Sequence, residues 1–242
     1  MIAVKFMQRY FALKKEKNYF ILPNDDYHHI LRVMRGKENE HIEVVYENCV
    51  YLCALKNVEQ SLTIEIDSLL EKGVKEREMI FCIPYLKETK MDFILQKGTE
   101  MGASMFILYP ATFSMVKIDD KKLPKKLERW NRILKEASEQ SKRTNIPQIQ
   151  TISHLRDLKD MTGVKFLCST REKEKTIKKF LQSQSNCDKL IVVIGPEGGL
   201  SEAEEKQLNE IGFESITLGN RILRVESVPL FVLSCLNYEF ME

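Results

Sequence analysis

The sequence of 242 residues predicts an α/β protein, with a small β-rich unit at the N-terminus and a larger domain of alternating strands and helices. Before the charged stretch at 71–78, apolar and polar side chains alternate with a period of two, which is typical of half-buried strands. From Met79 onward, short apolar runs alternate with segments whose apolar residues recur every three or four positions. That order favours a mainly parallel sheet covered by helices on both faces. The stretch at 71–78 contains a glycine and suits a linker, so we expect domains at 1–72 and 73–242.

The N-terminal unit is expected to form a small β-barrel. Its clearest alternating segments predict strands at 41–46, 50–55 and 62–66. A short helix is expected to begin at Asn24, a good N-cap residue, and to be stopped by Gly36. The residues of this helix that would face the core are Ile30, Leu31 and Met34. Arg32 and Arg35 would then lie on its outer face.

The second domain is expected to contain strands and helices in strict alternation. The strands are short apolar runs at 79–84, 106–109, 164–168, 190–194 and 215–218. Helical spacing predicts helices at 91–101, 127–141, 172–181, 201–211 and from 227 onward. Ser201 and Glu204 have the spacing of a capping box, which marks the start of the helix at 201–211.

Composition points to a globular protein in a reducing compartment. Hydrophobic residues make up 43% of the chain, and no apolar run approaches the roughly 20 residues needed to cross a bilayer. Lys5 and Arg9 interrupt the first residues before the apolar core of a signal peptide could form. The six cysteines contain no C-x-x-C pair and the four histidines are scattered, so we expect buried thiols and no metal site. A cytoplasmic location is the simplest expectation.

Charge is unevenly distributed, although the net charge is only +2. The segment 117–143 holds ten basic residues and five acidic ones. Such a local excess is expected where a protein meets a phosphate backbone, but a solvated helix face would produce the same pattern.

The segment GPEGGLS at 195–201 is the strongest candidate for a ligand site. It follows an apolar strand and precedes the capped helix, and ligands of open α/β sheets bind beyond the carboxyl ends of strands. Glycines there allow close approach to the backbone, whereas a plain turn would need about one glycine. The spacing is neither that of a P-loop nor that of the common dinucleotide-binding loop. A second unusual segment, LGNRILR at 218–224, follows the next strand, so both loops could form one pocket.

These paired segments resemble the C-terminal motifs of the RsmE family, SPOUT-superfamily methyltransferases that act on N3 of a uridine in small-subunit (16S) ribosomal RNA. Three further segments resemble motifs of the same family, and they are HILRVMRG at 29–36, QKGTEMG at 96–102 and RWNRILKEASEQSKR at 129–143. The matches are in order and extend over nearly the whole chain. The resemblance implies a PUA-like RNA-binding β-barrel, a SPOUT domain with a trefoil knot, a homodimer, and S-adenosyl-L-methionine (AdoMet) as the cofactor.

The resemblance also implies which residues hold the cofactor. They are Ile194, Gly195, Pro196, Glu197, Gly198, Gly199, Leu218, Gly219, Arg221, Ile222 and Leu223. The sequence departs from the family pattern at 225–228, where VESV replaces a usual threonine-glutamate-threonine-alanine run, so the bulkier Val225 and Val228 alter this part of the pocket. Glu47 and Asn48 replace a glycine-rich hairpin of the barrel.

Methyl transfer to uracil N3 requires alignment, loss of the N3 proton and stabilisation of the anionic base, but no metal. Arg224 is our candidate for stabilising the anion, and Glu226 and Glu197 are candidates for accepting the proton. An ion pair between Arg224 and Glu226 that fastens the loop is the alternative. The candidates for contacts with RNA phosphates are Arg32, Arg35, Arg129, Arg132, Lys142 and Arg143.

Two other functions stay open at this point. A SPOUT methyltransferase for another RNA position would share the fold and the cofactor. A non-catalytic RNA-binding protein of ribosome assembly would keep the barrel and the basic surfaces without needing an intact glycine loop.

Overall fold

A computed structural model describes residues 7–117, 119, 121–184 and 187–240 of the chain. Residues 1–6, which include Lys5, lie outside the described residues. The chain divides into two compact units, the first formed by 1–75 with 138–145 and the second by 76–137 with 146–242. The first unit therefore includes the short segment 138–145, which the sequence alone assigns to the second domain.

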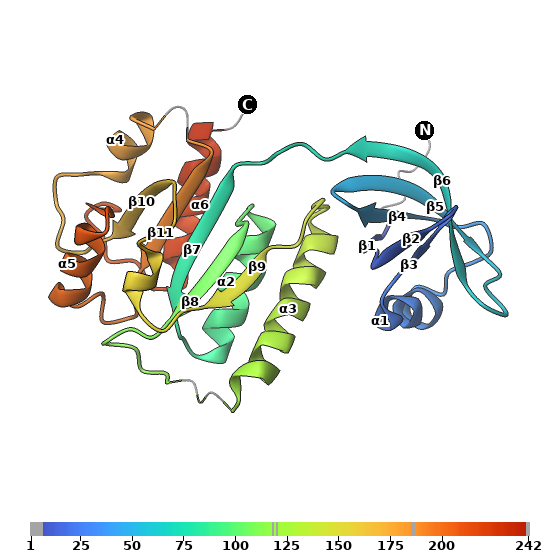
Figure 1. The fold of residues 1–242 in the computed structure, drawn as a ribbon, viewed down its shortest axis with the longest axis horizontal. Helices are drawn as coiled ribbons and strands as arrows, with labels where there is room; N and C mark the ends of the chain where they lie inside the picture. Colours follow the sequence, from blue (N-terminus) through green and yellow to red (C-terminus); the bar gives the residue numbers. More distant parts are fainter. Residues whose placement is uncertain (1–6, 118, 120, 185–186, 241–242) are drawn as a thin grey trace. The chain divides into compact units, whose positions relative to one another are not determined.

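The first unit is built on a curled six-stranded sheet with the strand order β1-β4-β5-β6-β3-β2 (Figure 1). The strands are β1 (Arg9–Phe11), β2 (Lys14–Glu16), β3 (Tyr19–Ile21), β4 (His41–Tyr46), β5 (Cys49–Lys56) and β6 (Thr63–Lys72). The three longer strands match the expected ones, and the three short ones were not singled out because three residues carry too little alternation. Large side chains such as Phe20, Leu55 and Ile64 fill the interior of this sheet.

The helix expected from Asn24 differs from the prediction in two respects. It consists of α1 (Asn24–His28) followed by a π-helical turn, η1 (His29–Val33), and the N-cap residue is Pro23, with no side-chain cap. Ile30 is buried as expected, but Leu31 and Met34 are 37% and 42% exposed. The wider π turn explains this, because it changes the angular spacing after Ile30 and turns the later residues outward.

The second unit is built on a six-stranded, entirely parallel sheet with the order β12-β10-β11-β7-β8-β9. The strands are β7 (Glu78–Pro84), β8 (Met105–Tyr109), β9 (Gln148–Thr151), β10 (Val164–Cys168), β11 (Lys189–Ile194) and β12 (Glu214–Ile216). The parallel sheet is confirmed. Only β9 was not expected, because its residues are polar and mostly exposed at the edge of the sheet.

Helices cover both faces of this sheet, as predicted (Figure 1). One face packs against α2 (Glu88–Glu100), α3 (Leu123–Gln140), α4 (Ile177–Gln182) and α6 (Ser227–Phe240). The other packs against α5 (Glu202–Glu210) and a 3-10 turn, η2 (Leu155–Leu158). Alternate strand residues divide between the two faces, so Phe81 belongs to the first layer and Ile80 to the second.

The start of α4 lies later than the expected residue 172. The carboxylate of Glu172 accepts backbone N–H groups of Lys173, Glu174 and Lys175, which holds this stretch in a turn. The helix then begins after Thr176, whose hydroxyl caps it. Among the described helices, none is long and apolar enough to cross a membrane.

Candidate active site

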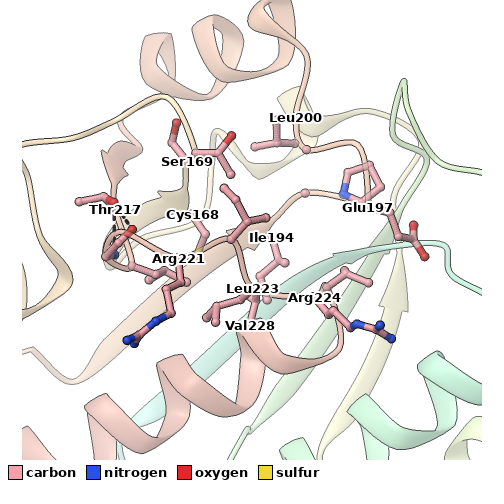
Figure 2. A pocket seen from close by; sticks show the side chains of 18 of the residues that line it. Cys168, Ser169, Ile194, Glu197, Leu200, Thr217, Arg221, Leu223, Arg224 and Val228 are labelled. Carbon is pink, nitrogen blue, oxygen red and sulfur yellow. Dashed lines mark hydrogen bonds between the residues drawn. The ribbon is translucent and has the colours of Figure 1, made fainter.

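A cavity of about 410 Å³ opens at the carboxyl ends of β10, β11 and β12, which are adjacent in the sheet. Its walls come from the three segments that follow these strands, 168–173, 194–200 and 217–225. Val228 at the start of α6 and Lys90 in the first turn of α2 complete the lining. Figure 2 shows the side chains of these segments gathered around the cavity from opposite sides.

The glycine loop after β11 is shaped by close backbone contacts. A Cβ atom on Gly195 would lie 2.8 Å from the backbone nitrogen of Leu200 and 2.9 Å from the carbonyl carbon of Gly199, so the loop closes tightly on itself. Gly199 has a φ of +75°, and its N–H donates to the carbonyl of Pro196 at 2.8 Å. Gly195, Pro196, Glu197 and Gly199 line the cavity as expected, whereas Gly198 is absent from the lining and packs near Phe113.

Both ends of this loop are fixed by hydrogen bonds. The buried hydroxyl of Tyr109 on β8 donates to the carbonyl of Ile194 at 2.7 Å, where the strand ends. At the other end, Ser201 and Glu204 form the expected capping box of α5. Glu204 also accepts the backbone N–H of Thr112 at 2.8 Å. The loop is therefore held in place before any ligand arrives.

The segment 217–225 forms the second wall. It contains all the expected residues of this motif, and Gly219 has a φ of +114°, which only glycine adopts without strain. Val225 and Val228, which replace the smaller or more polar residues of the family pattern, are 4% and 9% exposed and form part of the apolar floor. Thr217 joins this wall to the loop after β10, because its N–H donates to the carbonyl of Lys175 at 2.9 Å.

Sequence reasoning missed the third wall, which is formed by Cys168, Ser169, Thr170 and Lys173. This segment carries no glycine motif. Its signal is only its position after a strand expected at 164–168, and recognising it requires knowing that this strand lies beside β11 and β12. Burial raises the pKa of the Cys168 thiol to about 12, so the thiol is protonated at neutral pH.

Lys90 is a further residue of the cavity that sequence reasoning missed. Its Nζ atom lies 2.9 Å from Oε1 of Glu197 and 3.2 Å from Oε2 of Glu226, and so it bridges the two expected loops. The hydrogen bond with Glu197 is the main reason why the pKa of Lys90 is raised. The alternative interpretation of the sequence was that Arg224 forms an ion pair with Glu226. In the structure Glu226 forms its ion pair with Lys90 instead.

The same contacts set the ionisation of both carboxyls. Burial raises the pKa of Glu197, but the hydrogen bond and charge of Lys90 outweigh it, and the pKa lies below its ordinary value. For Glu226 the largest influence is its own backbone N–H, which together with Lys90 and Arg224 lowers the pKa. Both side chains are therefore carboxylates at neutral pH.

Arg221 and Arg224 line the cavity but have exposed side chains. Figure 2 shows them extending from opposite sides of the 218–225 segment, with Arg224 on the side of Glu197. Ile222 is 78% exposed, so only part of it faces the cavity. The exposed guanidinium of Arg224 thus lies on the same side of the segment as Glu197, and its charge also acts on Glu226, which does not belong to the cavity lining.

The expected phosphate-binding residues fall into two groups. Arg32 and Arg35 are exposed; Arg129 and Arg132 are also exposed but paired, Arg129 with Glu88 and Asp92 and Arg132 with Glu136. Lys142 and Arg143 belong to the first unit and form the second group. Lys142 pairs with Glu43 at 2.9 Å and its side chain is 34% exposed, whereas Arg143 is 8% exposed and donates to Asn145, so of the two only Arg143 is buried.

Comparison with known proteins gives the class to which this fold and cavity belong. The family model described as an RNA methyltransferase domain matches residues 74–237, which include every strand of the parallel sheet and all three walls of the cavity. The fold and the site are therefore those of an RNA methyltransferase.

The family within this class follows from full-length relatives. The ribosomal RNA small subunit methyltransferase E of Bacillus subtilis is 36% identical, over 96% of this chain and 97% of the relative. The enzyme of the same name from Mesomycoplasma hyopneumoniae is 33% identical, over 94% and 98%. A crystal structure of the Neisseria gonorrhoeae enzyme bound to S-adenosyl methionine is similar, with a TM-score of 0.83, 26% identity and coverage of 96% and 97%. The chain belongs to the ribosomal RNA small subunit methyltransferase E (RsmE) family.

Proposed function

We propose that the protein transfers a methyl group from AdoMet to N3 of a uridine in small-subunit (16S) ribosomal RNA. The observation that carries this proposal is the cavity itself, which joins the two family motifs at 195–201 and 218–224 into one site. The names of the full-length relatives and the AdoMet-bound neighbour support the substrate and the cofactor.

The residues of the cavity fit AdoMet. Its floor is apolar, with Ile194, Leu223 and Val228 placed to contact a flat adenine ring. Gly195 and Gly199 line the cavity without a side chain, so the polar parts of a nucleoside or an amino acid can approach the backbone of the loop closely. When bound, AdoMet supplies an activated methyl group on its sulfonium. The protein needs to add alignment, a route for the N3 proton and stabilisation of the anionic base.

Three charged side chains can serve the base. Glu197 and Glu226 are ionised at neutral pH, and we propose them as the candidates for accepting the N3 proton. The exposed guanidinium of Arg224 lies on the same side as Glu197, where it can stabilise the anionic uracil. Lys90 pairs with both carboxylates, of which Glu197 lines the cavity and Glu226 does not belong to the lining.

The finer features implied by the family belong to the same proposal. We propose that 1–72 is a PUA-like RNA-binding barrel, supported by the curled sheet with Arg32 and Arg35 exposed. We also propose that 73–242 is a SPOUT domain whose C-terminal part forms a trefoil knot. The placement of β10 between β11 and β12, with Thr217 bonded to Lys175 and Ile177, supports this topology. A cytoplasmic homodimer completes the proposal.

Two measurements test the function. Calorimetry on the purified protein should show AdoMet binding, and a protein that does not bind AdoMet would leave only the reading as a non-catalytic RNA-binding protein. Mapping of modified nucleotides in 16S RNA from a strain without the gene should then show the loss of one N3-methyluridine. Loss of a different modification would indicate a SPOUT enzyme for another RNA position, and the N3 assignment would be wrong.

A further inference from the structure

A buried carboxylate on α5 contacts the wall of the cavity that sequence reasoning missed. Glu205 is 9% exposed, and both its carboxylate oxygens lie 3.1 Å from the Oγ atom of Ser169. Ser169 is 5% exposed and lines the cavity directly after β10. A carboxylate in such a place is costly unless it is paired and hydrogen-bonded, so the positions of its partners are tightly defined.

Arg171 supplies the opposite charge and reaches a second wall. Its Nη1 atom donates to Oε1 of Glu205 at 2.8 Å and to the carbonyl of Leu200 at 2.8 Å. Leu200 lines the cavity at the end of the glycine loop. One guanidinium therefore holds the loop after β10 against the loop after β11.

Ser169 connects Glu205 to the backbone of the loop after β10. Its Oγ atom accepts the N–H of Arg171 at 3.1 Å and that of Glu172 at 3.3 Å, while its proton is directed at Glu205. Thr170, the next residue of the cavity wall, lies inside this turn. The conformation of the third wall thus depends on a carboxylate outside the cavity lining.

We infer that Glu205 is a positioning residue for the cofactor, which acts through Ser169 and Arg171 to hold the 168–173 wall in the shape that binds AdoMet. The inference rests on the proposed function, since it requires AdoMet in this cavity. Neither Glu205 nor Arg171 belongs to the lining, so a change at either position alters the wall without removing a group from it.

The test compares E205Q with E210Q, which removes an exposed carboxylate from the same helix. Glutamine keeps the shape of Glu205 but cannot accept hydrogen bonds on both terminal atoms. In the full-length protein, E205Q should raise the Kd and the KM for AdoMet at least tenfold. The value of kcat at saturating AdoMet and the Kd for 16S RNA should stay within twofold of the wild type, and E210Q should match the wild type throughout.

A second variant keeps the test decisive if E205Q does not fold. R171M removes the guanidinium from the side of the loop, and it should raise the same two constants in the same way. The double variant E205Q/S169A should bind AdoMet no more weakly than the weaker single variant, because both changes break one network.

The outcomes separate the inference from the function on which it rests. A wild-type protein without AdoMet affinity contradicts the proposed function. A wild-type protein that binds AdoMet, with E205Q and R171M binding it equally tightly, overturns the inference alone. A parallel loss of kcat, RNA affinity and AdoMet affinity would assign Glu205 to general stability and would also overturn it.

Discussion

Lys90 connects two loops through an ion pair with each of them and a hydrogen bond with Glu197. Its ammonium group lies within 3.2 Å of carboxylate oxygens on both Glu197 and Glu226, and these side chains are 27%, 30% and 21% exposed. Partial burial reduces the screening of such pairs by solvent, so the interaction is stronger than that of a surface ion pair. Two like charges on neighbouring loops would repel each other without this lysine.

Replacing Lys90 by methionine should make stability less dependent on the ionisation of the two glutamates. The folded-state pKa of each lies below the unfolded value, so the stabilisation is present above the unfolded pKa and is lost as pH falls through the lowered folded value. At pH 7, K90M should be less stable than the wild type by up to about 1 kcal/mol. The two unfolding free energies, measured in urea, should converge in acid.

K87M provides the matched control, because Lys87 is exposed and lies in the same turn of the chain. It changes the net charge equally and should leave the pH dependence unchanged. An equal effect of both variants would assign the loss to net charge instead of the bridge. The shift of Glu226 should persist in part in K90M, since its own backbone N–H is the largest cause.

Gly195 should be the least replaceable residue of the glycine loop. In G195A the new methyl group would lie 2.8 Å from the nitrogen of Leu200, so the loop must open. Calorimetry should show AdoMet affinity reduced at least tenfold.

G212A is the control for G195A, because Gly212 has a φ of +92° and no atom within 4 Å of the added methyl. It should lose about 1 kcal/mol of stability and keep its AdoMet affinity; unchanged binding by G195A would contradict this account of the loop.

Among the elements, those with a strong local signal were predicted from sequence. The capping box placed the start of α5 correctly, since Ser201 and Glu204 satisfy each other's backbone donors within four residues. The π-helical turn of η1 could not be predicted, because its residues have ordinary helical spacing in the sequence. Whether these residues form an α-helical or a π-helical turn depends on their packing in the core around Ile30, and that core is formed by strands distant in the sequence.

The capping box should contribute measurably to stability. Ser201→Ala removes the acceptor for the N–H of Glu204, so the unfolding free energy should fall by about 1 kcal/mol. S234A is the comparison, because Ser234 lies within α6, where its exposed hydroxyl only bonds to the carbonyl of Leu230. That change should stay within about 0.5 kcal/mol of the wild type. Equal losses in urea unfolding would exclude a specific contribution of the cap.

At the scale of the whole molecule, the sequence predicted two walls of the cavity and not the third. The walls at 194–200 and 217–225 carry family motifs, whereas the segment 168–173 becomes part of the site only through the strand order. The same limit applies to the charges. The sequence cannot distinguish Lys142, which lies in the turn after α3 and pairs with Glu43 across 99 residues, from an exposed lysine without a partner.

Removing an exposed arginine and removing a buried arginine should therefore have different effects, as Arg32 and Arg143 illustrate. R32A deletes an exposed charge of the first unit, so 16S RNA affinity should fall and its salt dependence should weaken by about one unit of slope. R143A deletes a buried guanidinium, so thermal stability should fall while the folded protein keeps its salt slope. Filter binding at several salt concentrations measures the RNA affinity and the salt slope of both variants, and thermal unfolding measures their stability. A normal slope for R32A would remove Arg32 from the RNA surface.

The three-walled cavity also determines when the protein can acquire its cofactor. A nascent chain emerges from its N-terminus, so all strands of the curled sheet and of the parallel sheet are synthesised before the wall at 217–225 and the floor at Val228. AdoMet therefore has no complete site until the chain has been translated as far as Val228. A premature stop codon anywhere before residue 217 yields a product that lacks one wall of the cavity, so bound AdoMet distinguishes molecules that contain this wall from molecules interrupted before it.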